Sequence, residues 1–231
     1  MTDSDLARDP IADAKERLLD TLPDHVAFDG WSRAAIDAAA VDAGVAPELA
    51  RLAFPRGGID AALAFHARGD RRMAEAYALE SPVGLGFTAK VTRAVRLRLE
   101  VIDEAREAVR RAASLFALPM YAPEGAAAVW RTADAIWNAV GDSSEDANWY
   151  TKRATLSGVY SATLLYWLND ETPGHAATWA FLDRRISDVM RIEKAKADLR
   201  KNPLGRMVMQ GVDRVSGLVR APRRGAEHPP A

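Results

Sequence analysis

The spacing of apolar residues along the chain is helical almost throughout. Apolar side chains recur every three or four positions, and no stretch shows the alternation of apolar and polar residues that is typical of a half-buried strand. The first such stretch runs from Ile11 to Val26, and a longer one begins at Val91 and continues to Phe116. The pattern therefore predicts an all-α fold.

Three helices are expected at the N-terminal end, because residues that start and stop helices occur there at suitable spacing. Gly30 ends the first helix, and Ser32 is an N-cap for a second helix that runs to Val41. Gly44 is a helix-ending signal, and Pro47 opens a third helix that runs to Phe54. Two short helices joined by a tight turn have the outline of a helix-turn-helix.

The later helices are predicted from the same periodicity. They cover residues 59–67, 70–79, 91–116, 123–140, 148–169 and 173–200. Thr172 followed by Pro173 is an N-cap with proline at the first helical position. The loop 81–86 is a candidate domain boundary. The chain is expected to divide into residues 1–80, 81–200 and 201–231.

The last segment differs from the rest in charge. Residues 199–224 contain seven basic side chains and one acidic side chain, a net charge of +6, whereas the whole chain carries −1. The remainder therefore carries −7. Six apolar residues at helical spacing follow the same segment: Leu204, Met207, Val208, Val212, Val215 and Leu218. Three interspersed glycines disfavour an isolated helix by about 1 kcal/mol each relative to alanine, so we expect an amphipathic helix that forms on a membrane surface.

Catalytic and metal-site chemistry has little support in the sequence. The chain has no cysteine, which excludes disulfides, thiolate metal sites and a cysteine nucleophile. Its four histidines are scattered without ligand spacing, and it lacks both a phosphate-binding loop and a serine nucleophile motif. We therefore expect a protein without catalytic residues, metal or cofactor.

The net charge of the helix-turn-helix segment indicates whether it could bind DNA. Residues 29–60 contain three arginines and five acidic side chains, a net charge of −2. A DNA backbone would be repelled by this surface. We therefore expect no nucleic-acid partner and a three-helix unit that keeps only the shape of a DNA-binding domain.

Large aromatic residues gather in the C-terminal half, within and beside a helix that is apolar nearly all round. Ordinary core packing accounts for them, and so does the lining of a cavity for an apolar ligand. The candidates for lining such a cavity are Phe116, Trp130, Trp137, Leu164, Leu165, Trp167 and Leu168.

A second aromatic feature lies at the predicted start of the same helix. The segment from Asn148 to Arg153 reads NWYTKR, with two large aromatics beside charged residues. Exposed Trp and Tyr next to Arg are typical of protein interfaces, whereas helix capping and local packing are the alternative interpretation.

These residues together resemble a known family. The segment from Gly141 to Arg153 is GDSSEDANWYTKR. It is followed by Leu156, Val159, Tyr160, Thr163, Asp170, Thr178, Trp179 and the run FLDRRI at 181–186. This combination is similar to the ubiquinone (coenzyme Q) biosynthesis accessory family, the ninth protein of the coenzyme Q set. The resemblance extends more loosely from Ile11 to Arg200.

The resemblance implies a TetR-like homodimer that has lost transcriptional function. It also implies that residues 81–200 bind lipids, including isoprenoid quinone intermediates or phospholipid, and present them to the demethoxyubiquinone hydroxylase. The partner-contacting patch of the family corresponds to Asp146, Asn148, Trp149, Tyr150 and Arg153. The tail after residue 200 would be the amphipathic helix that docks on membrane.

The expected location follows from the N-terminal residues. Residues 1–10 carry acids where a targeting peptide would carry basic residues, which suggests a bacterial member of the family. We expect a cytoplasmic protein, peripheral on the inner face of the membrane. Two other functions stay open: a TetR-type repressor that senses a hydrophobic effector, and an enzyme that acts on quinone precursors.

Overall fold

The computed structural model describes residues 9–82, 84–142 and 147–201. Within these ranges every regular element is helical and none is a strand, so the all-α prediction is confirmed. Asp146 and the apolar stripe predicted between residues 204 and 218 lie outside the described residues, as do the side chains at 147, 148 and 192–201.

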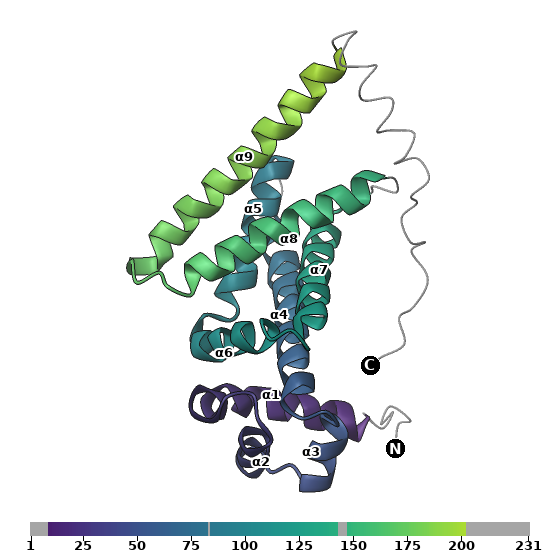
Figure 1. The fold of residues 1–231 in the computed structure, drawn as a ribbon, viewed down its shortest axis with the longest axis vertical. Coiled ribbons are helices and arrows are strands. Elements are labelled where there is room, and N and C mark those ends of the chain that lie inside the picture. The colour runs from purple at the N-terminus through teal and green to yellow at the C-terminus, as the bar shows by residue number, and fades with distance from the viewer. Residues whose placement is uncertain (1–8, 83, 143–146, 202–231) are drawn as a thin grey trace.

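The N-terminal helices begin and end close to the predicted positions. They are α1 (Pro10–Asp29), α2 (Arg33–Asp42) and α3 (Pro47–Ala53), and they lie together at one end of the molecule (Figure 1). The Ser32 side chain accepts a hydrogen bond from the Ala35 amide at 3.1 Å, as an N-cap does. Gly44 has a φ of +60°, which lets the chain turn sharply after α2.

The predicted helices 59–67 and 70–79 are one continuous helix, α4 (Gly58–Glu80). Gly69 lies within this helix and has a packing role. A Cβ atom at this position would lie 2.6 Å from Nη1 of Arg98, so only glycine permits the close approach. The helix leads from the N-terminal helices into the body (Figure 1).

The long helix predicted for residues 91–116 is broken into two. It forms α5 (Phe87–Glu100), the short 3₁₀ helix η1 (Asp103–Ala105) and α6 (Arg106–Phe116). Ile102 leaves the helical conformation, with φ −120° and ψ 9°, and its side chain is buried. The break lets α6 pack beside α1 and α7, whereas α5 packs beside α4 and α9.

Arg98 on α5 is buried, although arginine side chains usually reach solvent. Its side chain is 1% exposed. Nε donates to Oδ1 of Asp70 at 2.7 Å, and the hydroxyl of Thr132 donates to the same oxygen at 2.7 Å. The buried charge is thus paired and hydrogen-bonded, as burial of a charge requires, and it joins α4, α5 and α7.

A histidine belongs to the same buried group. Nε2 of His66 lies 2.8 Å from the Thr132 hydroxyl oxygen, and the His66 carbonyl accepts from Arg98 at 3.0 Å. Burial, together with the positive charge of Arg98, lowers the pKa of His66 to about 4. The ring is therefore neutral at pH 7.

The last three long helices form the other end of the body. They are α7 (Ala122–Ala139), α8 (Ala147–Trp167) and α9 (Ala176–Lys201), with the 3₁₀ helix η2 (Pro173–His175) before α9. The long helix predicted from Pro173 starts later, at Ala176, and Thr172 precedes η2 without a side-chain cap bond to it. The Thr172 hydroxyl instead accepts from the Ala177 amide of α9 at 3.0 Å. Helix α9 packs against α8 and α5.

Asp170 fixes the turn between α8 and α9. Its carboxylate accepts four hydrogen bonds, from the amides and hydroxyls of Thr172 and Thr178, at 2.6 to 2.9 Å. Burial opposes its ionisation, but these bonds outweigh burial and hold the pKa of Asp170 well below its usual value. The carboxylate therefore sets where α9 begins relative to α8.

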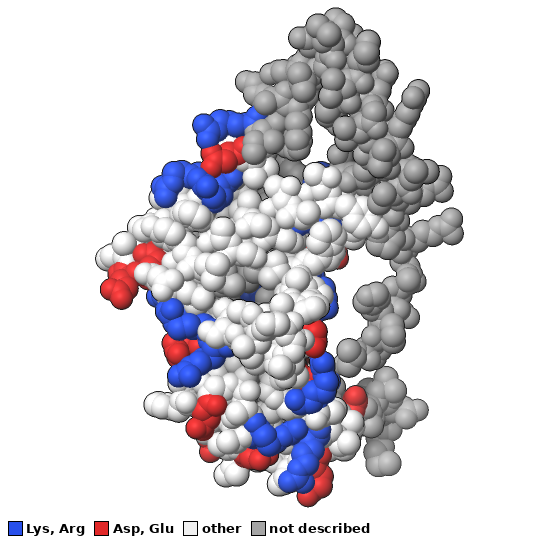
Figure 2. Space-filling view, in the orientation of Figure 1, with Lys and Arg blue, Asp and Glu red and all other residues white. Residues whose placement is uncertain are grey.

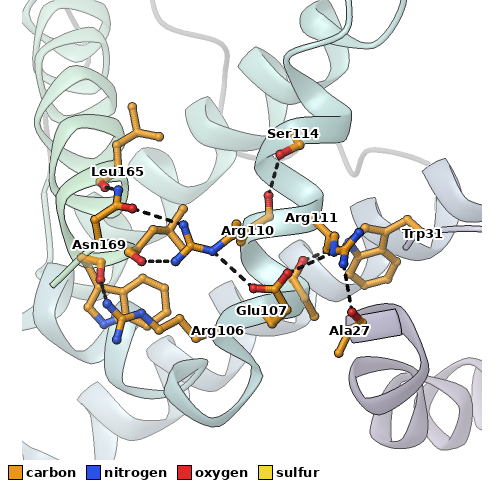
Figure 3. A network of polar contacts seen from close by, with 12 residues as sticks. Ala27, Trp31, Arg106, Glu107, Arg110, Arg111, Ser114, Leu165 and Asn169 are labelled. Atoms are coloured by element: carbon orange, nitrogen blue, oxygen red, sulfur yellow. Dashed lines mark hydrogen bonds and ion pairs between the residues drawn. The ribbon is translucent and has the colours of Figure 1, made fainter. Parts of the chain in front are cut away.

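Helix α6 joins the N-terminal helices to the body (Figure 3). The indole Nε1 of Trp31 donates to the Ala108 carbonyl at 3.0 Å, and Arg111 donates to the Ala27 carbonyl at 3.1 Å. These bonds hold α6 against the end of α1 and the turn that follows it.

The opposite side of α6 contacts the C-terminal end of α8. Arg106 donates to the carbonyl of Trp167, and Arg110 donates to the carbonyl of Leu168. The last carbonyls of a helix lack partners within the helix and carry its negative dipole end. The two arginines therefore satisfy the end of α8 and help to fix its position.

Candidate functional site

An apolar cavity of about 310 Å³ lies between α5, α7, α8 and α9. Its size is at the lower end of the roughly 300–1,000 Å³ typical of small-molecule sites. The lining residues are Phe87, Thr88, Val91, Trp137, Thr151, Lys152, Thr155, Leu156, Val159, Ile186, Val189 and Met190. Aliphatic and aromatic side chains dominate this set, so the cavity is suited to an apolar ligand.

Polar groups reach the cavity at the start of α8. The Lys152 ammonium lies 5.3 Å from the ring centroid of Trp137 and 5.7 Å from that of Phe87, and these two rings stack at 5.5 Å. Nζ of Lys152 also forms an ion pair with Oδ1 of Asp142 at 2.7 Å. The cation therefore has a carboxylate partner and aromatic neighbours.

The seven residues predicted to line a lipid cavity do not come together in the structure. Trp137 lines the cavity, whereas Trp167 and Leu168 are buried in the core and Leu164 packs against that core. Leu165 is exposed and lines a shallow surface groove.

The other two predicted residues also have different neighbours. Phe116 packs against Gly125, where an added Cβ on the glycine would lie 2.7 Å from the Cβ of Phe116. Trp130 contacts Trp149 and Tyr150. The apolar walls of the cavity come instead from residues such as Leu156. The sequence places these residues on apolar helix faces but does not indicate that a cavity lies beside them. Lipid contact by the predicted residues stays a prediction.

Trp149 and Tyr150 form a partly exposed aromatic patch. Their ring centroids are 4.7 Å apart in an edge-on arrangement, and Trp130 lies 6.0 Å from Trp149 and 6.3 Å from Tyr150. Helices α7 and α8 thus contribute three aromatic rings to one surface. We call Trp130, Trp149 and Tyr150 the aromatic patch.

The side chain of Arg153 is buried and packs against the aromatic patch. Its side chain is 1% exposed, and its guanidinium carbon lies 3.9 Å from the ring centroid of Trp149. Nε donates to Oδ1 of Asp134 at 2.5 Å. In this arrangement Arg153 positions Trp149, whereas direct contact of Arg153 with a partner stays a prediction.

One carboxylate connects the cavity with the aromatic patch. Oδ1 of Asp142 binds Lys152 at the cavity, while Oδ2 lies 3.6 Å from Nη1 of Arg153 beneath the patch. Asp142 is itself buried, and its amide donates to the Trp137 carbonyl at 2.9 Å. The two candidate sites therefore share a buried anion.

Three arginines at the helix-turn-helix end are bound to other groups of the protein itself. Arg17 and Arg33 donate to the backbone carbonyls of Gly44 and Phe54 at 3.0 Å, and Arg56 pairs with two carboxylates at 2.7 and 2.9 Å. Figure 2 shows acidic and basic side chains interspersed over this end. These three guanidinium groups are therefore engaged within the protein, and the absence of a nucleic-acid partner stays a prediction.

In the part of the chain that the structure covers, no cluster of three or more His, Asp or Glu could hold a metal ion. Among the same residues, no helix is both long and apolar enough to span a bilayer.

Residues 122–193 match the COQ9 family model. The match begins at the start of α7 and extends into α9, so it includes the aromatic patch, Asp142 and three of the four helices around the cavity.

Curated relatives carry the name ubiquinone biosynthesis protein COQ9, mitochondrial. The Drosophila melanogaster protein is 32% identical over 186 residues, which cover 78% of this chain and 56% of the fly protein. The Rattus norvegicus protein is 31% identical, covering 84% of this chain and 62% of its own length. The Homo sapiens protein is 29% identical, with coverages of 86% and 64%. The chain thus spans less than two thirds of the length of each of these relatives.

A solved structure gives the fold. The TetR transcriptional regulator from Nitrosomonas europaea aligns with a TM-score of 0.62 and 20% sequence identity, covering 75% of this chain and 95% of the regulator. At this identity the likeness shows the fold alone, and it confirms the TetR-like prediction.

Proposed function

Because the chain belongs to the COQ9 family, we propose that it is a non-catalytic accessory protein of ubiquinone biosynthesis. It binds the head and first isoprene units of a quinone intermediate in the cavity between α5, α7, α8 and α9. It then presents this ligand to the demethoxyubiquinone hydroxylase.

The apolar cavity is the observation that carries this proposal. A polyprenylated quinone does not leave a bilayer readily, since each methylene buried from water is worth about 0.8 kcal/mol. A protein that offers an apolar enclosure lowers this barrier. Val91, Leu156 and Val159 supply such walls, and the cavity lies within the body of the protein rather than at its DNA-binding-like end.

The aromatic patch is the surface we assign to the hydroxylase. Trp149 and Tyr150 are partly exposed and ordered by Arg153, and rigid aromatic side chains of this kind dominate binding energy at protein interfaces. The patch shares Asp142 with the cavity, so a partner bound there would lie close to the ligand.

The remaining parts of the proposal concern assembly and location. We assign the protein to a homodimer that docks peripherally on a membrane through the tail after residue 200, on the inner face in a bacterial cell. The stripe from Leu204 to Leu218 would insert at the interface, and the arginines around it would bind anionic headgroups.

Mass spectrometry of the protein purified from its own host tests the ligand directly. We expect an isoprenoid quinone intermediate to copurify with the natural chain and to be lost from Val159→Phe, which fills the cavity. Leu165→Phe is the matched control, because Leu165 lies on the same helix but outside the cavity, and it should retain the lipid. Absence of any lipid from the natural chain would contradict the proposal.

A TetR-type repressor that senses a hydrophobic effector is the second candidate, favoured by the fold alone. The occupied arginines and the net charge of −2 over residues 29–60 oppose it. A sequence-selective, salt-dependent gel shift at nanomolar protein would establish this candidate and displace the first.

A further inference from the structure

Exposed apolar side chains gather where α4 turns into α5. Leu79 is 87% exposed, Leu85 is 45% exposed and Phe87 is 47% exposed, within nine residues of chain. Met190 on α9 is 50% exposed and lines the same cavity as Phe87. We call Leu79, Leu85, Phe87 and Met190 the entrance surface.

The entrance surface is held in place by the helices that carry it. The Glu80 carboxylate accepts from Nε of Arg93 at 2.8 Å, which ties the end of α4 to α5. Phe87 stacks on Trp137 at 5.5 Å and so is fixed against α7. Because Phe87 and Met190 both line the cavity and reach solvent, the cavity opens between them.

We propose that the entrance surface docks on an anionic phospholipid bilayer, so that the cavity opens directly into the membrane interface. This inference rests on the proposed lipid-binding function. The body of the protein, and not the tail alone, would then contact the membrane.

Two observations favour a bilayer over a protein as the occupant of this surface. The cavity entrance lies within it, and a ligand held in a bilayer reaches the cavity without crossing water only if that entrance faces the lipid. Helix α9 also runs past this end of the molecule (Figure 1) and leads into residues 199–224, whose net charge of +6 complements anionic lipid.

Exposure alone does not define this surface. Phe28, near the end of α1, is 86% exposed, but it lies among the N-terminal helices, and it does not line the cavity. It therefore provides a matched control for Leu79, since the two side chains are almost equally exposed near the ends of their helices.

Because the chain contains no cysteine, a fluorophore can be placed at one chosen position. Leu79→Cys, Leu85→Cys and Phe28→Cys are labelled with an environment-sensitive dye in the full chain and mixed with vesicles of anionic and neutral phospholipid. We expect a blue shift and brighter emission at positions 79 and 85, and no change at position 28. Co-sedimentation without a shift at 79 and 85, or an equal shift at 28, would overturn the proposal.

A second pair of variants measures the contribution to binding. Leu79→Asp with Leu85→Asp should weaken vesicle binding by about tenfold, because apolar side chains inserted in the interface supply much of the affinity. Phe28→Asp should bind as the natural chain does, and unchanged helical circular dichroism would show that the variants fold. Equal binding by all variants would overturn the proposal.

The lipid analysis separates this inference from the function on which it rests. Labels that shift on vesicles in a protein that copurifies no lipid would support the docking surface and contradict the ligand proposal. Copurified quinone without a shift at 79 and 85 would support the ligand and overturn the docking surface.

Discussion

The helix-turn-helix end and the cavity end of this molecule use the same kinds of residue differently. In α1–α3, the apolar side chains of residues such as Leu18, Leu22 and Ile36 are fully buried in continuous contact. In the bundle of α5, α7, α8 and α9, comparable aliphatic side chains surround a space of about 310 Å³. In this TetR-like fold the N-terminal helices are therefore closely packed, whereas the body encloses a cavity.

Truncation of the packed core should have the largest effect. Leu22→Ala should lower the free energy of unfolding by about 3 kcal/mol, because a buried leucine loses both transfer free energy and contacts. Leu165→Ala on α8 is the exposed control and should change it by less than about 0.5 kcal/mol. Urea unfolding measures both, and a small effect at Leu22 would show that the N-terminal end is loosely packed.

The buried polar group between the two ends should make stability depend on pH. Since the pKa of His66 is lowered to about 4, the folded state binds fewer protons than the unfolded state between pH 6.5 and 4. Stability should fall by about 2 kcal/mol as the pH decreases through this window, allowing for partial exposure of the ring. His66→Gln should remove most of this slope, and an unchanged slope would contradict the assignment.

A larger buried side chain should lower stability at the helix-turn-helix end but not at the cavity end. Ala39→Leu should destabilise by about 1–2 kcal/mol, because Ala39 on α2 is fully buried in the core. Val159→Leu should be neutral or slightly stabilising, because its side chain borders the cavity. Thermal unfolding distinguishes them, and equal destabilisation would mean that the cavity closes in solution.

The aromatic patch should contribute least to folding. Trp149→Ala should lower stability by about 1 kcal/mol or less, since the ring is partly exposed and its main contact is with Arg153. It should nevertheless weaken capture of the demethoxyubiquinone hydroxylase in a pull-down. Leu165→Ala, on the same helix, should leave capture unchanged. A large loss of stability with unchanged capture would restore the alternative interpretation of local packing.

The sequence predicted helix caps better than it predicted contacts and cavities between helices. Ser32 was correctly placed as a cap, because capping depends on residues only a few positions away. The contact between Gly69 and Arg98 was not predicted, because the glycine permits the close approach of an arginine from a different helix. That contact has no local signal.

The candidate site shows the same limit. Trp149 and Tyr150 could be identified because partly exposed aromatics beside charged residues form a local pattern. The cavity could not, since Leu156 and Trp167 both fit a buried helix face, yet only Leu156 borders empty space. The volume left between helices depends on how four of them are oriented, which periodicity within one helix does not specify.

Asp142 gives this arrangement a thermodynamic consequence. One carboxylate interacts with Lys152 at the cavity and with Arg153 beneath the aromatic patch, so a shift of this carboxylate toward one cation changes its distance to the other. A ligand that displaces Lys152 would change the energy with which Trp149 is held. By linkage, a partner bound at Trp149 must then change the affinity for that ligand by the same factor. Loading and release would thus be reciprocal.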